Sequence, residues 1–277
     1  MSSNSIRTCI VLVVLSLVGA IIPAKTSNAF DPGDLEKVRD RKDCIGCDLS
    51  SAPLHKANLA GLDLTSTDLS SADLSSANLR KATLENANLS YADLSGANLR
   101  KSSLIGADVK HARLSFSFAL ECDCRGLVFS GSNLAGARFN GASLQWADFQ
   151  SAVLMRVDFS GADLSHANFR GAYLGKFVVH NVALKSVDFQ HANLVGVDFR
   201  EANLSGMNLA RQDLHGANFQ GADLSAANLF HVNLVGANLV DADLSGANLS
   251  GAIISENMRL KAKNYLDFET IWEFRRD

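Results

Sequence analysis

The sequence predicts an all-β protein that winds into a four-cornered solenoid. Three observations favour this fold. Leucine or phenylalanine stands at 37 of the 42 positions that follow at intervals of five from Leu49 to Ile254, alanine is common two places before them, and phenylalanine occupies them in a regular order. A chain that is 47% hydrophobic and 20% charged has enough apolar side chains to fill a core, which excludes a disordered protein.

The interval of five residues fits neither a helix nor a continuous strand. In a helix the repeated side chains would spread around every side, and in a strand they would alternate between two faces. The alanine and the leucine or phenylalanine are two residues apart, so they share one side of a short extended segment. The residues between segments must then turn a corner. Four corners close a coil of about 20 residues, and successive coils stack about 4.8 Å apart.

The phenylalanines indicate the number of corners. In a coil of about 20 residues they fall on two opposite faces only, whereas a three-sided coil would scatter them. One predicted column comprises Phe129, Phe149, Phe169 and Phe189, and the other comprises Phe139, Phe159, Phe199 and Phe219. Rings stacked from coil to coil add about 0.5–1.5 kcal/mol per contact to the stability of the core.

The repeated pattern Ala-(Asp/Asn)-Leu-x-x, seen twice in YADLSGANLR (residues 91–100), resembles that of the pentapeptide-repeat family. The resemblance extends over residues 44–254. It implies a right-handed quadrilateral β-helix of about ten coils, with four units per coil. It also implies an interior filled by side chains, with no lumen for a ligand, and outward Asn and Asp that bond to corner backbone.

The first 29 residues have the pattern of a secretory signal peptide. Arg7 precedes an uncharged run at residues 9–22, and the small residues Ser27 and Ala29, at −3 and −1, place the cut between Ala29 and Phe30. The alternative is an uncleaved anchor, but a run of 14 residues is shorter than the roughly 20 that span a membrane. Export of the mature chain is therefore expected.

The two ends depart from the repeat and are expected to be caps. Residues 30–43 form an N-terminal cap with a short helix near Asp34, residues 44–254 form the β-helix, and residues 255–277 form a C-terminal helical cap with an apolar side. Caps cover strand edges that would otherwise pair end to end, so a monomer or an end-stacked dimer is expected. Within the repeat, residues 115–128 lose the usual residue types. They form either a continuous degenerate coil, which we favour, or a bulge that rejoins in register.

Four cysteines remain after the signal. Cys44 and Cys47 both point inward across one corner, so a local disulfide fits, with two buried free thiols or a redox function as alternatives. Cys122 and Cys124 are expected to be two separate small core residues. A zinc site shared by both pairs is excluded in a continuous coil, because nearly four coils separate them. The string KDCIGCDLSSA (residues 42–52) resembles the start of exported cyanobacterial pentapeptide-repeat proteins, which favours the thylakoid lumen or periplasm.

Charge and motifs exclude several functions. There are 26 basic and 29 acidic residues, and loss of Arg7 and Lys25 with the signal leaves a net charge of −5, so a nucleic-acid binder is not expected. The seven histidines fall at outward corners, and no catalytic or phosphate-binding motif occurs. We therefore expect no enzyme activity, no cofactor and no metal.

One surface feature suggests a partner. Arg80-Lys81 and Arg100-Lys101 are 20 residues apart and should lie in adjacent coils of one face. They are either a docking site for an acidic protein or an anionic membrane surface, or four solvated side chains. The expected function is an exported, non-catalytic interaction scaffold with an unknown protein partner. The alternative is a DNA-mimicking inhibitor of a topoisomerase-type enzyme, as in some members of the family, although the negative charge here is dilute.

Overall fold

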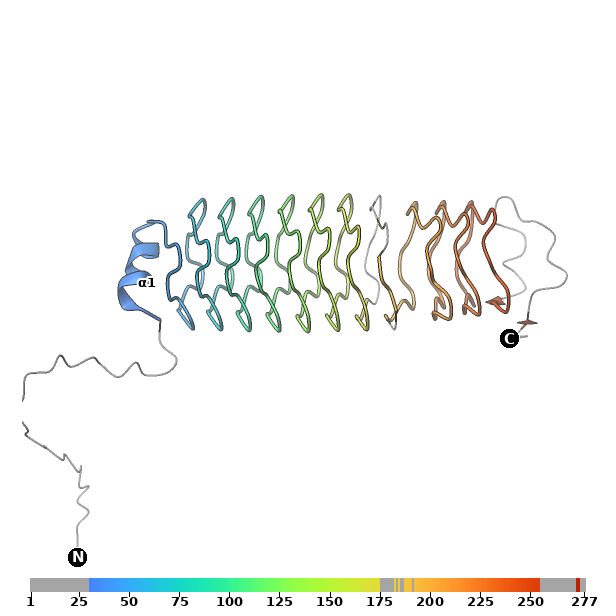
Figure 1. Ribbon diagram of the computed structural model, residues 1–277, viewed down its shortest axis with the longest axis horizontal. Helices are drawn as coiled ribbons and strands as arrows, with labels where there is room; N and C mark the ends of the chain where they lie inside the picture. The colour runs from blue at the N-terminus through green and yellow to red at the C-terminus, as the bar shows by residue number, and fades with distance from the viewer. Residues whose placement is uncertain are drawn as a thin grey trace, which may run out of the picture.

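A computed structural model describes residues 30–174, 182, 184, 187–190, 192–254 and 273–274. Its named elements are the helix α1 (Pro32–Arg39) and the strands β1 (Ile253–Ile254) and β2 (Glu273–Phe274). Between α1 and β1 the chain forms a row of stacked coils that gives an elongated rod (Figure 1). Within the described residues no helix is long and apolar enough to cross a bilayer.

Each coil takes about 20 residues. Parallel β-bridges join residues that are 20 apart, from Asp48 and Asp68 at the start of the repeat to Asn233 and Ile253 at its end. Each side of the coil contributes a single bridging residue. The rod is therefore β-type in its hydrogen bonding, although most of its sides are too short to form regular strands. This is a β-helix with four sides per coil.

One pattern of hydrogen bonds recurs at many corners of the described coils. After Leu69, for example, the amide of Ala72 donates to the Leu69 carbonyl at 3.1 Å, and the Asp68 carboxylate accepts from the amide of Ser70 at 2.9 Å. The second corner residue takes a left-handed backbone conformation, as at Ser71 with φ 57°. Asp and Asn are common directly before the buried Leu or Phe, because there their side chains accept a hydrogen bond from the backbone amide two residues on.

The core contains the repeated leucines, phenylalanines and alanines, nearly all of them fully buried. Phe149 stacks on Phe129 and on Phe169, with ring centroids 4.6 Å apart in both pairs. Phe159 meets the edge of Phe149 from the opposite side, with centroids 5.6 Å apart. Further contacts within the columns join Phe169 to Phe189, Phe139 to Phe159, and Phe199 to Phe219. The two columns therefore pack against each other across the centre of the rod.

Residues 115–128 form a continuous coil with no bulge. Phe118 bridges to Asn98 and Arg138, and Asp123 bridges to Ser103 and Ser143, so the spacing of 20 residues holds through the degenerate stretch. The register survives because Ala119 and Cys124 stay buried at the positions where other coils place Leu or Phe.

The helix α1 lies at the N-terminal end of the rod (Figure 1). Asp31 caps it by accepting from the amides of Gly33 and Asp34 at 2.8 and 3.2 Å. Leu35 and Val38 are buried against the first coil. The amide of Asp31 also donates to the carbonyl of Asp48 at 2.9 Å, which joins the cap to the coil.

The C-terminal end differs from the expected helical cap in the part that is described. Glu273 and Phe274 form β2, which pairs in parallel with β1 so that Ile253 lies opposite Glu273. A strand forms here because the last coil offers an unpaired backbone edge, and edge pairing satisfies those groups. The rest of residues 255–277 and the predicted signal at 1–29 lie outside the described residues.

Candidate interaction surface

The basic patch, Arg80, Lys81, Arg100 and Lys101, lies at one corner of two adjacent coils. The amide of Lys81 donates to the carbonyl of Arg100 at 3.0 Å, so the two pairs are immediate neighbours. All four side chains are exposed. The coil geometry therefore brings together the four cations that the sequence singles out.

Glu121 adds an anion that the sequence analysis missed. Its carboxylate lies 3.1 Å from the Arg100 guanidinium and 3.1 Å from the Lys101 ammonium. Hydrogen bonds from Lys101 and Arg100 hold the pKa of Glu121 below its usual range. The signal was available in the sequence, because Glu121 follows Lys101 by 20 residues and so occupies the same corner of the next coil. Within the described residues, Arg80 and Lys81 have no ion pair of this kind.

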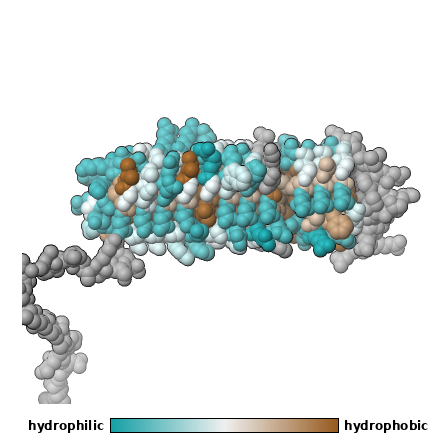
Figure 2. Space-filling view, viewed as in Figure 1, coloured by the Kyte–Doolittle hydropathy of each residue, from teal (hydrophilic) through white to brown (hydrophobic). Residues whose placement is uncertain are grey.

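Two exposed aromatic side chains lie in the same coil as Glu121, and one of them, Phe118, lines a surface pocket together with Arg100 of the patch. Phe116 is 69% exposed and Phe118 is 42% exposed. Both come from the degenerate stretch, where they replace the small or polar residues of other coils. The face of the rod in Figure 2 is mainly hydrophilic, with hydrophobic residues scattered singly over it.

The cysteines form two close pairs. The Cα atoms of Cys44 and Cys47 are 5.4 Å apart and their sulfurs lie 1.99 Å apart, and both side chains are buried. Cys122 and Cys124 have Cα atoms 5.6 Å apart, with sulfurs 2.15 Å apart. This differs from the expectation of two separate small residues. The pair meets because side chains two apart point to the same side of an extended segment.

Asp34 of α1 lies beside the first cysteine pair. A carboxylate oxygen of Asp34 and the sulfurs of Cys44 and Cys47 lie within 4.8 Å of one another, and all three are possible metal ligands. The carboxylate of Asp34 already accepts from Lys37 at 2.8 Å and from the amide of Asp48 at 2.9 Å. Metal binding needs thiolates, which joined sulfurs do not offer. The arrangement in the structure therefore suits a cap contact better than a metal site.

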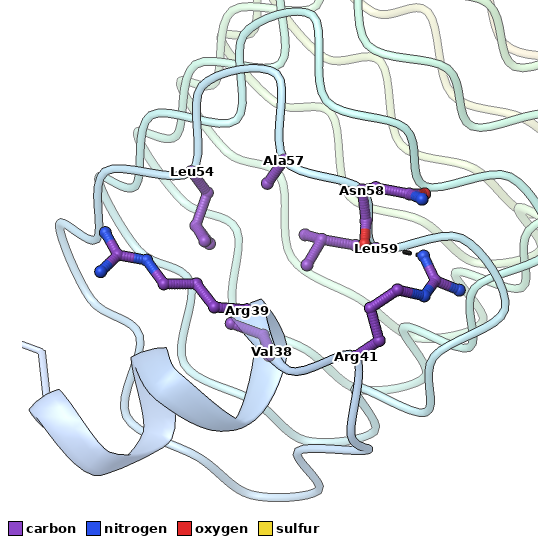
Figure 3. Close-up of a pocket in the computed structure, with 7 residues that line it drawn as sticks. All are labelled: Val38, Arg39, Arg41, Leu54, Ala57, Asn58 and Leu59. Carbon is purple, nitrogen blue, oxygen red and sulfur yellow. Dashed lines mark hydrogen bonds between the residues drawn. The ribbon is translucent and has the colours of Figure 1, made fainter.

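A small pocket lies between α1 and the first coils (Figure 3). Its volume is about 230 Å³, and it is lined by Val38, Arg39, Arg41, Leu54, Ala57, Asn58 and Leu59. Arg41 donates to the carbonyls of Asn58 and Ala60 at 2.9 and 2.8 Å. Small-molecule sites usually measure roughly 300–1,000 Å³. This pocket is smaller than such sites. Because the Arg41 guanidinium already donates to two backbone carbonyls, its main role is to satisfy these groups at the end of the coil.

The acidic side chains of the rod act as hydrogen-bond acceptors. Hydrogen bonds from the side chain and backbone of Thr65 lower the pKa of Asp63. At Asp163 burial raises the pKa, but hydrogen bonds from Ser165 and Gln145 outweigh it and the net shift is downward. A general acid needs a pKa shifted upward toward neutral pH. The lowered pKa values instead keep these carboxylates ionised, so that they accept hydrogen bonds from corner residues.

Comparisons with known proteins agree with the repeat. The family model for pentapeptide repeats matches in 8 copies, over residues 43–80, 77–115, 122–161, 158–200, 192–229 and 222–256. No curated protein matches the chain. Among solved structures, the chain is similar to HetL from Nostoc sp. strain PCC 7120, a pentapeptide-repeat protein involved in heterocyst differentiation regulation. The identity is 30%, the TM-score is 0.40, and the match covers 74% of this chain and 87% of HetL.

The chain is also similar to two further solved structures. QnrB1, a plasmid-mediated fluoroquinolone resistance protein, is 21% identical with a TM-score of 0.45, and the match covers 68% of this chain and 89% of that one. A pentapeptide-repeat protein of the Arabidopsis thaliana thylakoid lumen is 28% identical with a TM-score of 0.16, covering 46% of this chain and 67% of that one. Because the family model matches most of the residues from 43 to 256, this chain belongs to the pentapeptide-repeat family.

Proposed function

We propose that this protein is an exported, non-catalytic scaffold that binds another protein along the side of a rigid rod. The packed interior carries this proposal. Large side chains such as Phe149 are fully buried between the coils, so the centre of the rod is occupied by its own core. Partners must therefore be bound on the outer faces, where each coil displays corner and bridging side chains.

Export to the thylakoid lumen or periplasm is the second part of the proposal. It is supported by the signal pattern that ends at Ala29 and by the paired cysteines, which we propose to be disulfides in the exported protein. The proposed layout is a signal at 1–29, a cap at 30–43, a right-handed β-helix at 44–254 and a second cap at 255–277. We propose a monomer or an end-stacked dimer as the assembled form.

The test is expression of the full chain with a C-terminal tag in a cyanobacterium, followed by cell fractionation. The expected result is a mature chain that begins at Phe30, recovered from the lumen or periplasm, together with a protein that is captured reproducibly. Retention in the cytoplasm with an intact N-terminus would contradict export. In that case, inhibition of DNA supercoiling by a topoisomerase would be the assay for the alternative, DNA mimicry.

A further inference from the structure

A groove crosses one face of the rod next to the basic patch. It is lined by Gly96, Asn98, Arg100, Phe118 and Leu120, and its volume is about 330 Å³. It arises where a coil with small side chains meets a coil with large ones. Gly96 has no side chain, and the residue that bridges to Asn98 in the next coil is Phe118. We call these five residues the apolar groove.

The large side chains of the groove are not required by the fold. At the position of Phe118, the three preceding coils have Asn58, Asn78 and Asn98. Phe116 is likewise exposed, and its ring lies where a side chain at Gly136 would meet it at 2.7 Å. An exposed bridging residue gains little from burial within the rod. The Arg138 guanidinium lies over the Phe118 ring, 5.8 Å from its centroid, and the exposed remainder of the ring is available to a partner.

The charges around the groove select the partner. Arg100 belongs to both the groove and the basic patch, and Lys101, Arg80 and Lys81 extend the positive charge along the corner. The only anion that contacts this patch among the described residues is Glu121, which holds Arg100 and Lys101 at 3.1 Å. This cluster is positive in a chain whose net charge is −3. Complementary charge steers and orients a partner of opposite sign.

We propose that the apolar groove and the basic patch together bind an acidic protein segment that carries one large apolar side chain. The apolar side chain enters the groove against Phe118 and Leu120, and the acidic residues contact Arg80, Lys81, Arg100 and Lys101. A volume of about 330 Å³ is at the low end for binding pockets, which suits one side chain better than a cofactor. This inference rests on the proposed scaffold function, whose partner class and binding face it specifies.

Glu121 has a definite part in this mechanism. It pairs with Arg100 and Lys101 in the free protein and cancels one of their two charges, so an incoming carboxylate must compete with it. Its removal leaves both cations unpaired at the edge of the groove. Glu121→Gln should therefore strengthen binding of an acidic segment, which a merely structural role for Glu121 would not do.

The test measures binding of labelled short peptides by fluorescence anisotropy, using the mature full chain at low and at moderate salt. One peptide contains Asp and Glu around a central Phe, a second has Ser in place of that Phe, and a third has Lys in place of the acidic residues. We expect only the first to bind well, with affinity that falls as salt screens the charges. Phe118→Asn should weaken binding at least about fivefold, as for an interface anchor. Glu121→Gln should strengthen it about threefold at low salt.

Matched variants control for folding and for general loss of aromatic or acidic groups. Phe118→Asn restores the residue of the preceding coils, so the rod should stay folded, as circular dichroism will show. Tyr173→Asn removes an aromatic residue from another face with a similar exposed fraction, 44%. Glu85→Gln removes a carboxylate that bonds to Ser103 and not to the patch. Both controls should bind the first peptide like the unsubstituted protein.

Three outcomes would overturn the inference. One is equal binding of the Phe and Ser peptides, which would leave the groove without a role. Another is unchanged binding by Phe118→Asn and Glu121→Gln. The third is capture of the protein by vesicles with anionic lipids in the absence of peptide binding, which would assign the patch to a membrane. If a partner is still captured from the lumen or periplasm by the Phe118→Asn variant, the scaffold function stands and this binding face is wrong.

Discussion

The hydroxyl of Ser117 is buried in the core without a hydrogen-bond partner, and its removal should stabilise the protein. Ser117 is fully buried, and its Oγ has no hydrogen-bond partner. Ala97 and Ala137 occupy the same position in the coils before and after it, so alanine fits the site. The change Ser117→Ala removes the buried polar atom and leaves the surrounding packing almost unaltered.

The size of the effect follows from the cost of a buried, unpaired polar group, which is about 1–3 kcal/mol. We expect Ser117→Ala to raise the free energy of unfolding by about 1–2 kcal/mol, because the small void left by the oxygen offsets part of the gain. In a chain of this size that corresponds to a rise in melting temperature of about 2–6 °C.

Ser132→Ala is the matched control. Ser132 is equally buried, but its Oγ donates to the carbonyl of Val109 at 2.6 Å. Loss of that bond should lower the free energy of unfolding by about 0.5–1.5 kcal/mol, so the two identical substitutions should have opposite signs. Urea and thermal unfolding followed by circular dichroism will measure both. If Ser117→Ala destabilises the rod as much as Ser132→Ala does, the Ser117 hydroxyl has a partner and the reasoning is refuted.

Three further predictions concern the core, the N-terminal end and pH. Phe149→Ala should lower the free energy of unfolding by about 3–5 kcal/mol, and Phe149→Leu by less than about 2 kcal/mol, in urea titrations, because leucine keeps most of the buried volume and loses only the ring stacking; equal losses would contradict this ranking of the two effects. Arg41→Ala, which frees two edge carbonyls, should speed amide hydrogen exchange in the first coil and leave the last coils unchanged, whereas uniform exchange would argue against a local capping role. Because Thr65 lowers the pKa of Asp63, this carboxylate adds stability above its ordinary pKa, and that stability is lost as the pH falls through the lowered value. The urea midpoint should therefore be flat from about pH 7 to 5 and fall below about pH 4, less steeply in Asp63→Asn, and a midpoint that rises on acidification would contradict this.

The repeat could be predicted in detail because every unit obeys the same local rule. Burial of Leu or Phe at each fifth residue fixes which side chains point inward, and the stacking of coils 20 residues apart follows from that single constraint. The order of Phe129, Phe149 and Phe169 was informative for the same reason, since rings can stack only when they occupy the same side of successive coils.

Features that depend on one residue's neighbours in other coils were harder to predict. Glu121 looks like an ordinary corner residue in the sequence, and its role as the partner of Arg100 and Lys101 arises only when side-chain conformations place the three charges together. The apolar groove has the same origin, because it is the difference in size between residues of adjacent coils that creates it.

The sequence by itself determined the family, the length of the coil and the identity of the buried residues, because these are set by a short local pattern repeated in register. The tertiary structure alone decided the contact of Cys122 with Cys124, the pairing of Glu121 and the parallel pairing of β2 with β1. The physical reason is that the repeat fixes the corner or side on which each residue lies, but not which neighbouring side chains or strand edges then make contact. Their geometry depends on side-chain orientation and on which backbone edge is left unpaired, and neither is encoded in the period of five.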